Sequence, residues 1–357
     1  MLTSIKNHVK PGYIVLLIFL AFSMLFPVVS DNRFYIRLIT EIFFFAAMGN
    51  AWNIIGGYGK QISWASAAFV AVGAYAGILP FVRLTEPFAT LFSAPVSPWL
   101  SAPVGMVLAI LLAVIIGKPC FRMRGVYFAI ATIACTTIVR LLLLYFRYFT
   151  GGAVGIQFRI VAEDSWWLLQ FRSPGVPFYF IAFFWMLVTT GIVMWVERSK
   201  LGYYLRAICD DQDAAESLGI KSSTVKLNAF MLSAAMLSLT GTFFVFFMRY
   251  ADPGMFASHA LSVRIAIVVI LGGMGRVWGP LVGAFLSLTL LQVSNQYLRA
   301  FGGAATGWVL YGLLIVLMVL FRPNGIISLF DNFGTNIVKL RDKLFGRVQT
   351  QSGGDGK

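Results

Sequence analysis

The chain has 357 residues, of which 59% are hydrophobic and only 12% are charged, with a formal net charge of +14. Soluble domains typically have about a quarter of their residues charged, so a water-soluble globule of this size is excluded. A disordered polymer is excluded as well, because this much apolar surface must be buried, and we therefore expect a membrane protein.

Ten apolar segments can cross a bilayer as helices. A helix needs roughly 20 apolar residues to span the hydrocarbon layer, where the backbone must satisfy its own hydrogen bonds. The segments are 12–29, 34–55, 62–82, 98–117, 125–146, 176–197, 224–248, 262–274, 278–298 and 304–321. The segment 262–274 is short, so we expect it to be broken or re-entrant. The sequence thus predicts an all-α, polytopic membrane helix bundle of about ten crossings.

The positive charges indicate the orientation of these segments. Cytoplasmic loops carry an excess of Lys and Arg. With the N-terminus in the cytoplasm, 18 of the 28 Lys and Arg residues fall on the cytoplasmic side. We therefore expect both termini in the cytoplasm, and we interpret the net charge as an orientation signal and not as a nucleic-acid site. The first segment could also be a signal peptide, but nine further crossings favour a signal-anchor.

Polar residues within the segments are candidates for a translocation pathway. Glu41 lies inside an apolar segment, and it either pairs with Arg37 one turn earlier or faces a pathway. Hydroxyl and amide side chains can line a polar passage, but hydrogen bonding between helices explains them equally well. These residues are Asn50, Asn53, Gln61, Ser63, Ser66, Thr132, Thr136, Thr137, Ser233 and Thr240.

The outer loop 147–175 contains two acidic residues and two tryptophans, Glu163, Asp164, Trp166 and Trp167. Tryptophan is enriched where a protein meets the lipid headgroups. We therefore expect an interfacial helix in this loop.

The inner loop 198–223 is longer than a connection between neighbouring helices requires. It predicts two short helices, the second capped by Asp210 or Asp211. Gly219 is a natural end for the second helix.

The second of these helices presents both apolar and acidic residues. Asp213 and Glu216 lie near its positive N-terminal end. We expect an apolar knob with an acidic rim, formed by Ala214, Ala215, Leu218 and Ile220. Such a knob suits docking into a groove on a soluble partner, but it equally suits a connector that lies on the membrane surface.

Glycines interrupt the apolar stretch 261–298. Gly272 and Gly273 give the backbone freedom where the helix breaks, which suits a hinge. Small residues four positions apart let two helix backbones approach closely, either for tight packing or at a sliding gate. Two sets have this spacing on a predicted helix face: Gly73 with Gly77, and Gly275 with Gly279 and Gly283.

The chain divides into a transmembrane domain, 1–325, and a cytoplasmic tail, 326–357. Within the tail, 335–348 has a basic and an apolar side, which suits either a helix on anionic lipid or a solvated segment. We expect 351–357 to be disordered. Three cysteines and two histidines form neither a disulfide framework nor a metal cluster by their spacing.

Several stretches form motifs that are specific when taken together. They are Asn53-Ile-Ile-Gly-Gly-Tyr-Gly-Lys-Gln-Ile-Ser63, Arg124-Gly-Val-Tyr-Phe-Ala-Ile-Ala-Thr132, Thr150-Gly-Gly-Ala-Val-Gly-Ile156, Ala214-Ala-Glu-Ser-Leu-Gly-Ile220, Leu271-Gly-Gly-Met-Gly-Arg-Val-Trp-Gly-Pro-Leu-Val-Gly-Ala284 and Phe321-Arg-Pro-Asn-Gly-Ile326. In this order they resemble the permease subunits of branched-chain amino-acid ABC importers, of the LivM type. The resemblance runs from about residue 50 to residue 326.

The resemblance implies a multi-pass subunit of the bacterial inner membrane that imports branched-chain or other hydrophobic amino acids. The sequence lacks a Gly-x-x-x-x-Gly-Lys-Ser/Thr loop for ATP, so energy must come from elsewhere. The implied partners are two ABC ATPase subunits that use ATP and Mg, a homologous second permease and a periplasmic solute-binding protein, beside membrane lipid. We expect this chain to bind no cofactor and to catalyse no reaction.

The resemblance also selects candidate residues. It makes 214–220 part of an ATPase-coupling element, with the set Asp210, Asp213, Ala214, Ala215, Glu216, Leu218 and Gly219. It favours Ser63, Ser66 and Thr132 as pathway residues because they lie within or beside the motifs.

Two positions depart from the family pattern and leave the cargo open. Ala65-Ser66 stands where Gly-His is usual, and Thr137 stands where an acidic residue is common. The alternatives are the same class carrying urea, amides or aromatic acids, and an ion-coupled secondary transporter that works alone.

Overall fold

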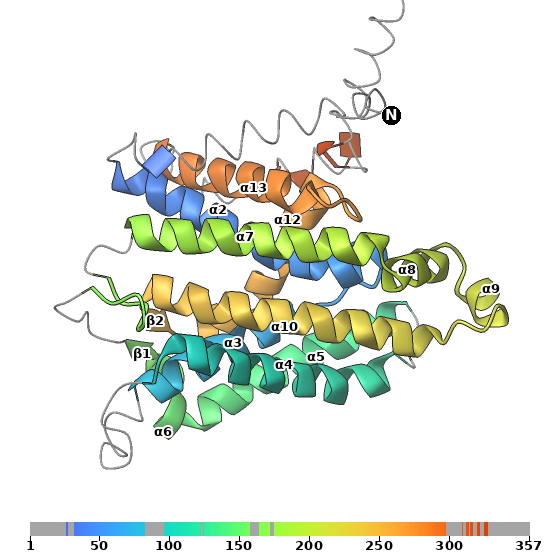
Figure 1. Cartoon of the computed structure of the whole chain (residues 1–357), viewed down its shortest axis with the longest axis horizontal. Helices are drawn as coiled ribbons and strands as arrows, with labels where there is room; N and C mark the ends of the chain where they lie inside the picture. Colours follow the sequence, from blue (N-terminus) through green and yellow to red (C-terminus); the bar gives the residue numbers. More distant parts are fainter. Residues whose placement is uncertain are drawn as a thin grey trace, which may run out of the picture.

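The computed structural model describes residues 32–82, 96–121, 125–157, 164–171 and 175–297, together with 26–27, 123 and a few residues between 309 and 327. Most of these residues are helical (Figure 1). The elements are α2 (Arg33–Asn53), the π-helix η1 (Ile54–Tyr58), α3 (Ser66–Val82), α4 (Pro98–Cys120), α5 (Val126–Tyr145), α6 (Arg147–Thr150), the 3-10 helix η2 (Gly152–Val154), β1 (Ile156–Gln157), α7 (Gly175–Arg198), α8 (Lys200–Asp210), α9 (Gln212–Ser217), α10 (Ser222–Met248), β2 (Tyr250–Ala251), α11 (Pro253–Phe256), α12 (His259–Gly272) and α13 (Gly279–Tyr297).

Six helical segments in the described part of the chain are long and apolar enough to cross a membrane. They are Arg33–Tyr58, Pro98–Cys120, Val126–Tyr145, Gly175–Arg198, Ser222–Met248 and Pro253–Gly272. The helices α3 and α13 are apolar but shorter. The predicted crossings 12–29 and 304–321 fall outside the described residues, apart from a few positions in 304–321. The total of about ten crossings and the location of both termini therefore stay predictions.

The segment expected to be short or broken, 262–274, is longer than its sequence suggested. The helical turn α11 precedes α12 with only Ala257 and Ser258 between them. Together they form a stretch of 20 residues that is long enough to cross a membrane. The sequence analysis placed no helix at 253–256, but α11 begins there with Pro253, because proline is well tolerated in the first turn of a helix.

The helices α2 and α10 form the centre of the bundle. In the most apolar part of each, 89% of the residues in α2 with η1 and 83% in α10 are buried, compared with 22% in α5. In Figure 1, α10 lies between α7 on one side and α3 and α4 on the other. A helix that is apolar on all sides packs in a core, so α2 and α10 position the other elements.

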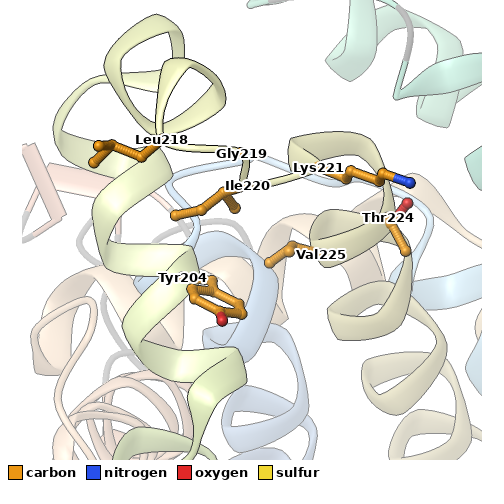
Figure 2. A pocket seen from close by; sticks show the side chains of 7 residues that line it. All are labelled: Tyr204, Leu218, Gly219, Ile220, Lys221, Thr224 and Val225. Atoms are coloured by element: carbon orange, nitrogen blue, oxygen red, sulfur yellow. The ribbon is translucent and has the colours of Figure 1, made fainter.

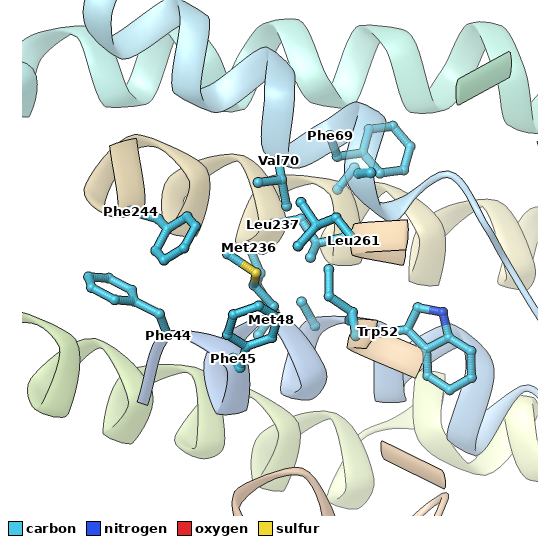
Figure 3. Close-up of a cluster of buried hydrophobic side chains, with 14 of the residues drawn as sticks. Phe44, Phe45, Met48, Trp52, Phe69, Val70, Met236, Leu237, Phe244 and Leu261 are labelled. Carbon is cyan, nitrogen blue, oxygen red and sulfur yellow. The ribbon is translucent and has the colours of Figure 1, made fainter. Parts of the chain in front are cut away.

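Aromatic and sulfur-containing side chains fill the space between α2, α3 and α10 (Figure 3). The rings of Phe44 on α2 and Phe244 on α10 meet edge to face, with centroids 5.5 Å apart. Phe69 on α3 meets Phe230 on α10 in the same way at 5.1 Å. This geometry is the favoured one for aromatic pairs, so these contacts fix how the three helices cross.

Glycines allow α3 and α10 to cross in direct backbone contact. A Cβ atom at Gly73 would overlap the backbone oxygen of Ser238, and one at Gly241 would overlap the backbone oxygen of Val70. At Gly77 the added atom would lie 2.7 Å from the side chain of Thr242. The close packing predicted for Gly73 and Gly77 is therefore confirmed, and Gly241 is its counterpart on α10.

The described residues also form one small two-stranded sheet, so the fold is mostly but not entirely α-helical. The strands β1 and β2 pair antiparallel, with Ile156 opposite Ala251. They lie at the end of the bundle away from α8 and α9 (Figure 1).

The described part of the loop 147–175 contains only the short helices α6 and η2 near its start, and residues 164–171, around the two tryptophans, form no interfacial helix. Residues 164–171 form a tight turn closed by a bridge between Ser165 and Gln170. Nearer its start, Gly151 and Gly155 have φ values of +77° and +74°, which a continuing right-handed helix cannot contain. Trp166 and Trp167 are still exposed, as a position near lipid headgroups requires.

The glycine contact between α3 and α10 predicts unequal effects of two alanine substitutions. Gly73→Ala should lower the free energy of unfolding by roughly 1–3 kcal/mol, because two backbones must separate. Gly191→Ala in α7 has no atom within 4 Å of the new Cβ and should be neutral or slightly stabilising. Thermal unfolding of the two variants in one detergent checks this, and equal shifts in melting temperature would contradict it.

Candidate functional site

Two short helices form the part of the molecule that projects beyond the bundle (Figure 1). Asp211 is the N-terminal cap of α9. Its carboxylate accepts hydrogen bonds from the amides of Asp213 at 2.9 Å and Ala214 at 3.0 Å. Asp210 is the last residue of α8. The two predicted helices of the inner loop are therefore confirmed, with Asp211 as the cap between them.

Gly219 ends α9 as its sequence predicts. Its amide donates to the carbonyl of Glu216 at 2.9 Å, and the amide of Ile220 donates to the carbonyl of Ala215 at 3.1 Å. This pair of bonds is the Schellman arrangement, which needs a left-handed residue. Gly219 has a φ of +86°, which glycine adopts without strain.

Polar side chains hold α9 against the start of α10. The Gln212 amide donates to the carboxylate of Glu216 at 2.9 Å and accepts from the ammonium of Lys226 at 2.8 Å. The hydroxyl of Ser222 also donates to Glu216. Glu216, predicted for an acidic rim, thus binds groups of its own chain, and α9 is fixed to α10 as one unit.

The predicted apolar knob is divided between two sides of α9. Ala215 is 3% exposed and faces the bundle, whereas Leu218 is 84% exposed and Ala214 is also exposed. Ile220 is half-buried because the chain reverses at Gly219. The knob of four residues is therefore wrong, and Leu218 is the large apolar side chain that α9 presents outward.

A hollow of about 440 Å³ lies beside Leu218, between α8 and the start of α10 (Figure 2). Its lining is mixed, with an aromatic ring, aliphatic side chains and one ammonium group. The residues are Tyr204, Leu218, Gly219, Ile220, Lys221, Thr224 and Val225. A hollow of this kind next to an exposed leucine can receive side chains from a second protein.

One arginine of α8, Arg206, contacts both α7 and η1. The guanidinium of Arg206 pairs with the carboxylate of Glu197 at 2.7 Å. It also lies over the ring of Tyr58 at 5.4 Å from the centroid, which is a cation–π distance. This contact joins the projecting helices to η1.

Hydroxyl groups satisfy the non-helical segment that precedes α3. The amide of Trp64 donates to Thr132 at 3.1 Å, and the carbonyl of Trp64 accepts from Thr136 at 2.9 Å and Ser262 at 2.8 Å. Ser262 also accepts from the amide of Ala67. These side chains come from α5 and α12, so three elements meet at one interruption.

The predicted pathway residues Ser63 and Ser66 lie at this same interruption and are buried. The hydroxyl of Ser63 accepts from the amide of Ala65 at 3.3 Å, and its carbonyl accepts from Trp52 at 2.8 Å. In this conformation Ser63 and Thr132 therefore hold the backbone around Trp64.

Thr137 faces a histidine on a neighbouring helix. Its hydroxyl lies 3.0 Å from Nε2 of His259, at the start of α12, and donates to the carbonyl of Ile133 at 3.1 Å. Within the described part of the chain, Nδ1 of His259 and Nε of Arg140 are buried without a hydrogen-bond partner. Arg140 is one turn from Thr137 on α5, so three polar groups gather where α5 meets α12.

Glu41 has two partners. The guanidinium of Arg37 lies 3.4 Å from one carboxylate oxygen, and the amide of Gln292 on α13 lies 3.4 Å from the other. The ion pair between Arg37 and Glu41 that the sequence offered as an alternative is therefore present.

The glycine-rich stretch contains one close helix contact and one tight loop. A Cβ at Gly272 would overlap the backbone oxygen of Gly279, and one at Gly283 would overlap that of Val268. We predicted that Gly275 shares a helix face with Gly279 and Gly283, and this prediction is wrong. It lies in the loop before α13 with a φ of +71°, because the helix starts only at Gly279.

Sequence reasoning missed several residues that carry these contacts. Arg206, Gln212 and Ser222 act across elements that sequence spacing does not connect. His259 had a signal, since it follows the capping residue Ser258 at the start of a polar-poor helix. Among the described residues, no group of three His, Cys, Asp or Glu side chains comes together as a metal site.

Residues 34–320 match a family described as branched-chain amino acid transport system / permease component. The chain belongs to this family. The resemblance found in the motifs is thereby confirmed. Together with the apolar helices, it makes this permease a multi-pass integral membrane protein.

Among individual relatives, two are branched-chain amino acid permeases and one is a ribose import permease. The permease is 29% identical over 337 residues to the high-affinity branched-chain amino acid transport system permease protein LivM of Escherichia coli, which covers 89% of this chain and 75% of the relative. It is 30% identical over 143 residues to the high-affinity branched-chain amino acid transport system permease protein BraD of Pseudomonas aeruginosa, and this match covers 40% of this chain and 44% of the relative. It is 26% identical over 211 residues to the ribose import permease protein RbsC of Escherichia coli, covering 54% and 64%. No solved structure matches the chain.

The cap of α9 predicts a local effect on hydrogen exchange. Asp211→Ala removes the carboxylate oxygen that accepts two hydrogen bonds and should destabilise α9 by about 1 kcal/mol, so the amides of α9 should exchange about fivefold faster. Asp210→Ala, which ends α8 without capping α9, is the matched control and should leave this exchange unchanged. Mass spectrometry of peptides covering 212–218 measures both variants, and equal acceleration in the two would contradict the assigned cap.

Proposed function

We propose that this permease is the transmembrane subunit of an ABC importer for branched-chain or other hydrophobic amino acids in a bacterial inner membrane. A separate ATPase drives it through α9, within the cytoplasmic loop 198–223. The observation that carries the proposal is the rigid, capped helix α9, which projects from a chain of this permease family.

The geometry of α9 supports docking over a membrane-surface connector. A connector would turn its large apolar side chains toward the bundle or the lipid, whereas Leu218 is 84% exposed at the C-terminal cap of α9, a helix that projects beyond the end of the bundle (Figure 1). The caps at both ends and the bonds to α10 keep the helix in one position. Because little conformational freedom is lost on binding, a helix held in this way suits recognition by a soluble partner.

The partners follow from what the chain itself provides. Its sequence has no phosphate-binding loop, so ATP and Mg would be bound by a pair of ATPase subunits. A homologous second permease would complete the passage, and a periplasmic binding protein would deliver the amino acid. In this arrangement Asp210, Asp213, Ala214 and Leu218 form the exposed contact set, while Ala215, Glu216 and Gly219 hold its shape.

The passage is assigned to the contact between α5 and α12. Thr137 lies eight residues before Tyr145 at the end of α5, or about 12 Å along the helix axis. The unpartnered nitrogens of His259 and Arg140 supply polar groups there. Ser63, Ser66 and Thr132 would border the passage through the segment before α3, and Glu41 would act through its pair with Arg37.

The docking assignment predicts the effect of changing the exposed leucine. Leu218→Asp should reduce amino-acid uptake at least tenfold and release the ATPase during purification, because a charge replaces the apolar contact. Ser217→Ala changes an exposed neighbour on the same helix and should leave both unchanged. Uptake by cells, together with copurification in mild detergent, measures the two variants. An ATPase retained at full yield by Leu218→Asp, with normal uptake, would contradict docking at α9.

The cargo and the energy source are tested by transport into vesicles. The permease, purified with its partners and supplied with its binding protein, should take up leucine, isoleucine or valine only when ATP is present. Competition by urea, simple amides or aromatic acids instead of these amino acids would change the cargo and keep the class. Uptake by this chain alone, driven by a proton or sodium gradient without ATP, would overturn the proposal.

A further inference from the structure

The C-terminal end of α2 continues directly into a π-helix. Residues 54–58 form the π-helix η1, in which each turn contains one extra residue. Such turns are rare, and they occur frequently at functional sites. All five residues of η1 are buried, so the irregular turn lies within the protein.

One face of η1 is bonded to the loop between α12 and α13. Asn53, the last residue of α2, donates from Nδ2 to the carbonyl of Arg276 at 2.9 Å. Its Oδ1 accepts from the amide of Gly275 at 2.9 Å. Asn53 is fully buried, so both polar groups of its amide depend on this loop.

Glycines bring the same two segments into backbone contact. A Cβ at Gly57 would lie 2.6 Å from the backbone nitrogen of Gly275 and would overlap the side-chain oxygen of Asn53. On the other side of the loop, Gly325 packs on Gly273, and the amide of Ile326 donates to the carbonyl of Leu271 at 3.0 Å. The loop 273–278 is therefore held between η1 and the stretch 325–326.

The end of η1 also contacts α8. The guanidinium of Arg206 lies over the ring of Tyr58, and Leu205 of α8 lies beside Gly59. Only Asp211 separates α8 from α9. A displacement of α9 would therefore reach η1 through α8 without passing through a flexible connection.

We propose that Arg206 and Asn53 are positioning residues that transmit movement of α8 through η1 to the loop 273–278, and so tilt α12 and α13 when ATP is used. This inference rests on the proposed function. The loop joins α12 and α13, and α12 begins at His259, which faces Thr137. The π-turn η1 thus contacts α8 on the side of the docking helices and the loop that leads into α12 and α13.

The test measures the number of amino acids taken up per ATP hydrolysed by the complete transporter in vesicles. Asn53→Ala and Arg206→Ala should each lower this ratio about fivefold or more while hydrolysis continues. The double variant should be no worse than the more affected single variant, because both residues act in one chain of contacts. A purely structural role would lower the yield of transporter and leave the ratio unchanged.

Thr242→Val is the matched control. Thr242 on α10 is equally buried, and its hydroxyl donates to the carbonyl of Gly73 on α3 at 2.8 Å. Its replacement should lower thermal stability without changing uptake per ATP. If Asn53→Ala fails to accumulate, Arg206→Ala and Arg206→Lys carry the test, because Arg206 is only half-buried and Lys keeps the charge without the flat stacking group.

An unchanged ratio in both single variants would overturn the inference, and so would losses that multiply in the double variant. These outcomes differ from a failure of the proposed function. If the unaltered transporter shows no ATP-dependent uptake, the proposed function itself is wrong. If the unaltered transporter works and its ratio survives both substitutions, only the path through η1 is wrong.

Discussion

The arrangement of this permease depends on satisfying backbone polar groups where its helices are interrupted within the bundle. Irregular backbone at membrane depth is tolerated only when protein groups or enclosed water bind it. Before α3, the amide and carbonyl of Trp64 bind three hydroxyl groups from α5 and α12. Between α12 and α13, the side chain of Asn53 takes the corresponding role.

Close backbone packing is needed both where helices cross and where they are interrupted. Glycine occurs where a side chain would overlap a neighbouring backbone, at Gly73 against Ser238 where α3 crosses α10, and at Gly272 against Gly279 on the two sides of the loop 273–278. The interior is otherwise filled by interlocking aromatic rings such as Phe44 and Phe244, which resist deformation. Movement is therefore expected at η1 and at the loop 273–278, and the packed helices around them would move as rigid bodies.

Much of this fold follows from sequence patterns, because they reflect local chemistry. Apolar length placed the described helices within a few residues, and Asp211 and Gly219 marked the ends of α9 through capping preferences that need no tertiary information. Contacts between distant segments could not be derived in this way. Spacing placed Gly275 on a helix face, whereas the structure places it in a loop with a positive φ. There its amide donates a hydrogen bond to Asn53, which is 222 positions away in the sequence. The polar residues were found by type, but sequence could not show that Thr132 binds Trp64 while Thr137 meets His259.

The central claim is that the end of the bundle carrying α9 faces the ATPase. Cross-linking from position 218 in the assembled transporter tests it most directly, with a photoreactive residue in place of Leu218. Tyr148, which is exposed in α6 at the opposite end, is the comparison site. The account predicts a cross-link to the ATPase from position 218 and none from position 148. A cross-link to the ATPase from position 148, with none from position 218, would contradict it.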